Sequence, residues 1–118
     1  MKRVLIISVL AAMVPSLVAA SGARQVTDRS EFIGLVEGKT ISRPLVKLNV
    51  SPDGRISGKG AKWAVSGEWS WQNGYFCRSL DWGGKDLGYN CQRVTVDGGS
   101  ISFTSDKGKG RSAEFSLR

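Results

Sequence analysis

The fold is decided by residues 67–80, which read GEWSWQNGYFCRSL. Asn73-Gly74 at the centre is typical of a two-residue β-hairpin turn, because that turn needs positive φ at both positions. Trp69 and Trp71 alternate with polar residues before the turn, as expected of a strand with one buried face. The turn fixes the pairing of its two strands, with Trp71 opposite Phe76, Ser70 opposite Cys77 and Trp69 opposite Arg78.

The chain contains two cysteines, Cys77 and Cys91, which can form a single disulfide. A bridge between neighbouring strands would place Phe76 opposite Gln92 and Arg78 opposite Asn90, since cross-strand partners share a face. Closing a loop of about 15 residues stabilises a small domain by roughly 3 kcal/mol in the chain-entropy model. No metal site is expected, because two cysteines without histidine do not complete the usual zinc ligand set.

Residues 1–20 are typical of a secretory signal peptide, with a basic start followed by an apolar run. Small residues allow cleavage after Ala20 or Ala23. A transmembrane anchor is the alternative, but the run is shorter than the roughly 20 residues of a spanning helix and Pro15 interrupts it. We therefore expect a periplasmic or secreted protein, residues 21–118, with no stable membrane anchor after cleavage.

One short helix and seven strands are expected in this region. The helix begins at Asp28, where Glu31 completes a capping-box pattern, and ends at Gly38. Its apolar stripe consists of Phe32, Leu35 and Val36. The strands are expected at residues 40–50 (with a bulge or edge at Pro44), 55–60, 62–71, 75–80, 87–96, 101–105 and 113–117, and residues 21–26 are expected to form a flexible lead.

The turns between these strands are too short for parallel crossovers, so the fold class is all-β. We expect an antiparallel meander that closes into a barrel or barrel-like sheet, because closure removes exposed edges. The helix would plug one mouth of the barrel or cover an open seam. A flat open sheet with one covered face is the alternative.

The hairpin register and the disulfide together predict which side chains share a face. The apolar face carries Trp63, Val65, Trp69, Trp71, Phe76, Leu80, Val94 and Val96. Arg78, Asn90 and Gln92 fall on the same face in mid-strand, and a buried guanidinium needs a partner or a purpose. We therefore hypothesise a ligand pocket formed by these three polar residues and walled by Trp69, Trp71 and Phe76. The alternative is a bulge between residues 76 and 90 that returns Arg78 to solvent and buries the disulfide.

Basic residues are a second candidate feature. Arg43, Lys47, Arg55 and Lys59 lie on the first expected hairpin, and Lys107, Lys109 and Arg111 lie in the last loop. They could bind anionic polymers or lipid headgroups. The alternative is a solvated outer face whose lysines protect a sheet edge from aggregation. Nucleic acid is not expected as a partner, because the aromatic residues alternate inward and do not interleave with the basic ones.

The composition excludes several kinds of enzyme. The chain of 118 residues contains no histidine, which removes Ser-His-Asp and Cys-His catalysis. A disulfide leaves no free thiol, and the KGKGR stretch at residues 107–111 is followed by no helix that could cradle phosphate. We expect a non-catalytic binding module without a cofactor, whose partner is an unknown small ligand or an envelope protein.

Several short motifs resemble a known family. They are SPDGRI at residues 51–56, GEWSW at 67–71, GYFCR at 74–78, LGYNCQ at 87–92 and FTSD at 103–106. Together they resemble small exported alphaproteobacterial proteins of uncharacterised function, some of which are named dihydrodipicolinate reductase. That name implies an NAD(P)H-dependent oxidoreductase with a Gly-rich turn between a strand and a helix, and with a histidine-bearing active-site motif. This chain departs from both features, since residues 1–20 contain no glycine and the whole chain contains no histidine.

Overall fold

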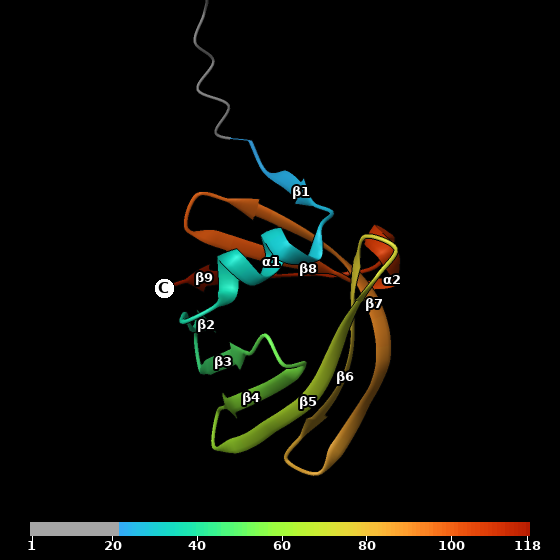
Figure 1. The fold of residues 1–118 in the computed structure, drawn as a ribbon. Coiled ribbons are helices and arrows are strands. Elements are labelled where there is room, and N and C mark those ends of the chain that lie inside the picture. Colours follow the sequence, from blue (N-terminus) through green and yellow to red (C-terminus); the bar gives the residue numbers. More distant parts are fainter. Residues whose placement is uncertain (1–21) are drawn as a thin grey trace, which may run out of the picture.

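The computed structural model describes residues 22–118, and the predicted signal peptide lies outside this range. Eight antiparallel strands close into a barrel, because β7 pairs with β8 as well as with β6, and β2 pairs with β9 (Figure 1). The barrel strands are β2 (Ile41–Arg43), β3 (Val46–Val50), β4 (Arg55–Gly60), β5 (Trp63–Gln72), β6 (Tyr75–Trp82), β7 (Lys85–Asp97), β8 (Ser100–Thr104) and β9 (Ser112–Leu117). The expected barrel is confirmed, and the flat open sheet is wrong.

The register predicted from the Asn73-Gly74 turn is confirmed. Trp71 pairs with Phe76, Ser70 with Cys77 and Trp69 with Arg78, and Phe76 and Arg78 pair with Gln92 and Asn90 on β7. Cys77 and Cys91 form the predicted disulfide. The register of β6 shifts only between Leu80 and Asp81, beyond Arg78, so the shift does not turn Arg78 to solvent. Cys77 is nevertheless almost fully buried, although it lies on the opposite face of the sheet from Arg78.

Residues 40–50 form two strands, where the sequence predicted one. β2 and β3 make a tight hairpin in which Ile41 pairs with Leu48 and Arg43 with Val46. Pro44 and Leu45 form the turn, and Leu45 has a φ of 68°. The reversal explains why Ile41 has the opposite sequence parity to Leu48 while both side chains are buried.

Residues 24–26 form a strand, so the expected flexible lead is wrong there. β1 (Arg24–Val26) pairs with the last part of β7, beyond the point where the β6–β7 ladder ends. Val26 pairs with Val94, and both side chains are fully buried. Burial of Val26 therefore draws this segment onto the sheet, which local sequence pattern did not indicate.

Helix α1 (Arg29–Val36) closes one end of the barrel, as one of the two predicted arrangements requires (Figure 1). The Phe32 side chain is fully buried, and its ring lies 5.2 Å from that of Trp69 and 5.1 Å from those of Trp71 and Phe76. The predicted helix bounds hold, with Gly38 at a φ of 73° just after the last turn. The predicted capping bond is absent, because Asp28 accepts a hydrogen bond from Ser30 and Glu31 pairs with Arg24.

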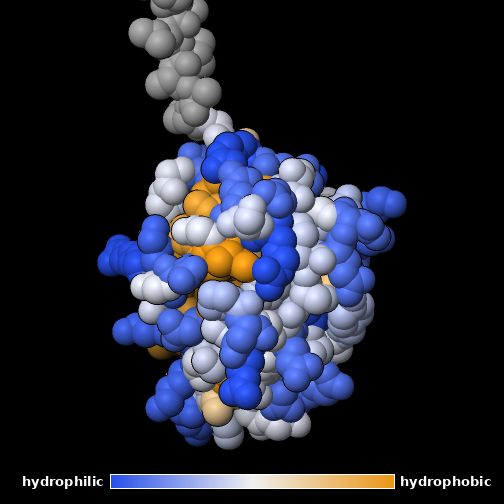
Figure 2. Space-filling view, in the orientation of Figure 1, coloured by the Kyte–Doolittle hydropathy of each residue, from blue (hydrophilic) through white to orange (hydrophobic). Residues whose placement is uncertain are grey.

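The last loop contains one short helical turn, α2 (Ser105–Gly108), with left-handed backbone at Asp106 and Lys107. No helix in the described residues is long and apolar enough to cross a membrane. Hydrophilic residues cover most of the face in Figure 2 and frame a hydrophobic area near α1.

Trp63 was predicted to belong to the buried apolar face, and this prediction is wrong. Its side chain is 50 % exposed, because Trp63 is the first residue of β5 and lies at the end of the barrel.

Candidate functional site

A cavity of about 420 Å³ lies inside the barrel, beyond the aromatic cluster that α1 covers. Its walls are mostly apolar and come from β2, β3, β4, β6, β7, β8 and β9. The apolar lining residues are Ile41, Leu48, Val50, Ile56, Phe76, Leu80, Phe103, Ala113 and Phe115. The polar ones are Arg43, Arg78, Gln92, Ser105, Arg111 and Ser112.

The cavity reaches solvent beside the short β2–β9 ladder. That ladder consists of the pairs Ile41–Leu117 and Ser42–Ser116, so the earlier residues of β9 pair with β8 alone. Arg43 and Arg111 both line the cavity and are exposed, which places its opening between the end of β2 and the start of β9. The Arg43 guanidinium lies over the Phe115 ring, 5.6 Å from its centroid.

Arg78 lies deeper in the cavity than the two arginines at the opening and is half-buried. Its Nη1 donates a hydrogen bond of 3.0 Å to the carbonyl oxygen of Gly88. Burial lowers the pKa of Arg78, because the charged guanidinium loses solvation. Both salt bridges among residues 22–118 involve other arginines, Arg24 and Arg55, so Arg78 has no carboxylate partner in this part of the chain.

Gln92 and Asn90 have different roles although the sequence grouped them. Gln92 lines the cavity, is 6 % exposed, and donates a hydrogen bond of 3.1 Å to the Ser105 hydroxyl. Asn90 makes two hydrogen bonds with Asp106, through its amide nitrogen at 2.7 Å and its amide oxygen at 3.0 Å. Asn90 therefore braces the β8–β9 loop and does not line the cavity.

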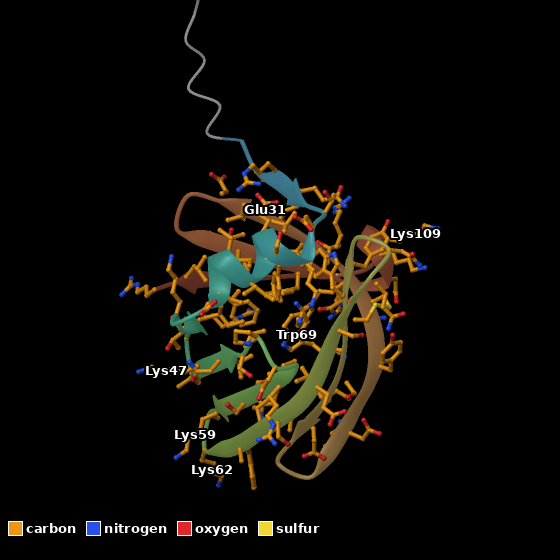
Figure 3. The ribbon with its side chains drawn as sticks, in the orientation of Figure 1. Glu31, Lys47, Lys59, Lys62, Trp69 and Lys109 are labelled. Carbon is orange, nitrogen blue, oxygen red and sulfur yellow. A yellow bond between two sulfur atoms is a disulfide. The ribbon has the colours of Figure 1, made fainter. Side chains whose placement is uncertain are left out.

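The three aromatic residues predicted to wall the pocket also lie in two different places. Phe76 lines the cavity. Trp69 and Trp71 lie at the end that α1 closes, where their indole nitrogens donate to the carbonyl oxygens of Ser51 at 2.8 Å and Thr27 at 3.2 Å. Figure 3 shows Trp69 below α1, in the interior. Of the six predicted ligand-contact residues, the structure brings Arg78, Gln92 and Phe76 together on the cavity.

The predicted basic surface does not form one patch. Lys47 and Lys59 are exposed and pair across the β3–β4 ladder. Arg55 lies at the opposite end of β4, where its Nε is 3.9 Å from a carboxylate oxygen of Asp53. Arg43 belongs to the cavity lining, as does Arg111 from the last loop.

Sequence reasoning missed the cavity roles of Arg43 and Arg111. For Arg43 a signal exists, since it is two residues from the buried Ile41 and therefore shares its face. For Arg111 no local signal exists, because it follows an irregular loop and precedes β9.

The charged side chains that line the cavity are all basic. The cavity lining contains three arginines and no Asp or Glu, and no group of three or more metal-ligating side chains occurs within residues 22–118. Every strand ladder in this range is antiparallel. The fold and the site together define a small disulfide-bonded antiparallel β-barrel with an arginine-lined internal cavity. Comparison with protein-family models, with curated proteins and with solved structures found no match.

Proposed function

We propose that this protein is a non-catalytic binding protein whose barrel cavity holds a small apolar molecule bearing an anionic group. The observation that carries the proposal is the composition of the cavity lining. Its walls are apolar, while its charged groups are the three arginines Arg43, Arg78 and Arg111, without a carboxylate. The volume of about 420 Å³ lies within the range of roughly 300–1,000 Å³ typical of small-molecule sites.

The charge of Arg78 is the strongest support for an anionic ligand. A half-buried guanidinium that lacks a carboxylate loses solvation without full compensation. A carboxylate, phosphate or sulfonate fits the planar donor set of arginine and can accept two of its hydrogen bonds. An anion at this depth would therefore bind more tightly than a neutral molecule of the same shape. Arg43 and Arg111 at the opening would attract it.

Two other roles receive less support. Binding of anionic polymers would need a continuous basic surface, but Arg55 lies at the opposite end of β4 from Lys59. A dinucleotide-dependent reductase would need a strand–turn–helix unit next to a parallel strand pair, whereas the described ladders are antiparallel. We therefore do not propose either role for this protein.

The test is calorimetric titration of the oxidised protein with a matched pair of probes, a medium-chain fatty acid and the alcohol of the same chain length. The acid is expected to bind more tightly than the alcohol. Arg78→Gln should weaken binding of the acid by about tenfold to a hundredfold, the value of hydrogen bonds to a charged group. Arg55→Gln is the matched control, because Arg55 is exposed and outside the cavity, and it should leave binding unchanged.

Arg111→Gln provides a second variant in case Arg78→Gln impairs folding. Arg111 is exposed in the loop before β9, so its replacement should leave the circular dichroism spectrum unchanged while weakening binding of the acid. Equal affinity for the acid and the alcohol would contradict the proposal. So would unchanged binding of the acid in both cavity variants.

A further inference from the structure

We propose that the end of the barrel opposite α1 docks onto an anionic phospholipid bilayer. We call this region the turn end; it comprises the β2–β3, β4–β5 and β6–β7 turns with the residues next to them, 43–47, 59–63 and 81–87. Three large apolar side chains are exposed there: Leu45 at 80 %, Trp63 at 50 % and Leu87 at 43 %. The fourth exposed large apolar side chain in the described residues, Tyr89, lies farther along β7.

The three turns form a contiguous surface. The amide of Ala61 donates a hydrogen bond of 2.6 Å to the carbonyl oxygen of Leu45, which joins the first turn to the second. The Trp63 side chain packs against Gly83, where a Cβ atom would stand 3.1 Å from the indole, and this contact joins the second turn to the third. Leu87 has no pairing partner on β6, because the β6–β7 register shifts between the Leu80–Gly88 pair and the Asp81–Asp86 pair. Its side chain therefore lies at the turn end, next to the third turn.

Leu45 has an unfavourable setting in two respects. Its φ of 68° is a conformation that residues other than glycine, asparagine and aspartate rarely adopt. Its side chain is the most exposed large apolar group among the described residues. An asparagine or glycine would suit this turn better on both counts, so a leucine at its tip points to a contact made outside the chain.

The charge around the apolar side chains is positive. Lys47, Lys59, Lys62 and Lys85 are exposed at the turn end, and the Lys62 ammonium lies 5.1 Å from the Trp63 ring centroid. Asp81 and Asp86 are the carboxylates there, and each accepts a backbone N–H at 2.8 Å within its own turn. Figure 3 shows Lys59 and Lys62 at this end of the molecule and Glu31 on α1 at the other.

This combination fits a lipid surface better than a protein partner. Tryptophan is favoured at the headgroup level of a bilayer, and lysines beside it are attracted to anionic lipid phosphates. Lysine is depleted in protein–protein interfaces, whose centres exclude charge. Docking would also bring the cavity opening close to the membrane, because Arg43 lines the cavity and lies two residues from Leu45.

The test is co-flotation of the protein, as recovered after export, with vesicles of phosphatidylcholine alone or mixed with phosphatidylglycerol. We expect binding to the mixed vesicles, weaker binding to the neutral ones, and loss of binding at high salt. The double variant Lys59→Gln/Lys62→Gln should reduce partitioning about twenty-fivefold, since each lysine near the surface contributes about fivefold. Lys109→Gln is its control, because Lys109 lies beside α2 and away from Lys59 and Lys62 (Figure 3).

The apolar contribution is tested with Leu45→Asn/Leu87→Gln, in which asparagine keeps the positive φ of the turn. Partitioning should fall about tenfold, and Tyr89→Ser, which removes an exposed side chain outside the turn end, should leave it unchanged. Arg78→Gln should also leave it unchanged, so failure of docking and failure of cavity binding can be told apart. Equal partitioning of the double variants and the unmodified chain would overturn the proposal, as would equal binding to neutral and mixed vesicles.

Discussion

At the scale of single residues, Arg78 combines burial with the lack of a carboxylate partner in the described chain. The sequence placed it on the inner face because the Asn73-Gly74 turn fixes its pairing with Trp69. The structure adds its hydrogen bond to Gly88 and its neighbours on the cavity, Phe76 and Gln92. Its guanidinium is therefore the group whose solvation a ligand anion would replace.

Binding of an anion is expected to be insensitive to pH wherever the anion itself stays ionised. The charged lining residues are arginines, and the chain contains no histidine that could titrate between pH 5 and 8. Burial lowers the pKa of Arg78, because it disfavours the protonated form, but an arginine side chain in a protein keeps its charge throughout this range of pH. A sulfonate should bind equally between about pH 5 and 9, while a fatty acid should lose affinity as its own carboxyl group protonates, near pH 4–5.

Calorimetric titrations of both ligands between about pH 4 and 9 measure the effect. A parallel loss of sulfonate and fatty-acid affinity at low pH would assign the titration to the protein instead. That result would contradict an arginine-only anion site.

At the scale of elements, α1 is held by its two buried side chains, Phe32 and Val36, of which Phe32 makes the aromatic contacts. Phe32 is fully buried and contacts the rings of Trp69, Trp71 and Phe76, while the neighbouring Ile33 is only partly buried. A helix of 8 residues is not stable on its own in water, so its place in the fold depends on this packing.

Phe32→Ala should lower the free energy of unfolding by about 3–5 kcal/mol, the usual cost of removing a buried phenylalanine. Ile33→Ala is the matched control on the same helix, and it should cost less because Ile33 keeps part of its surface in water. Urea denaturation followed by tryptophan fluorescence measures both values. Comparable losses in the two variants would mean that the helix is held by its exposed face as well.

At the scale of the whole molecule, the cavity exists because the meander closes through a very short β2–β9 ladder. The ladder ends at the Ser42–Ser116 pair, so Arg43 and Phe115 are not paired with each other and the interior is open beside Arg43. The barrel therefore has one end filled by α1 and its aromatic contacts, and an interior near the other end that is only partly filled.

A ligand that fills this space should stabilise the folded protein by mass action. At a free concentration of about 100 times its Kd, the stabilisation is expected to be about 2.7 kcal/mol, which corresponds to a rise in Tm of roughly 10 °C or more for a domain of this size. Thermal unfolding with and without a medium-chain fatty acid measures the shift. It should be retained in Arg55→Gln and reduced in Arg78→Gln, and an unchanged Tm for the unmodified protein would contradict binding in the cavity.

The sequence by itself determined the local features of this protein. The Asn73-Gly74 turn defined the β5–β6 register, the cysteine pair defined the β6–β7 register, and the spacing of Phe32 and Val36 defined the buried face of α1. These features follow from turn geometry and side-chain period, which depend only on residues close in sequence or covalently joined. The export signal and the periplasmic or secreted location stay predictions.

The tertiary structure alone decided the cavity. Arg43 and Arg111 meet at its opening because β2 pairs with β9, and Trp69 and Trp71 are removed from it because α1 packs on them. The hairpin at Leu45 and the strand at Val26 were likewise missed. The hairpin turn has leucine at a position of positive φ, where asparagine or glycine would signal a turn, and the strand depends on burial of Val26 against the distant Val94. Periodicity shows which face of a strand is buried, but closure and shear of the barrel determine which distant side chains share the enclosed space.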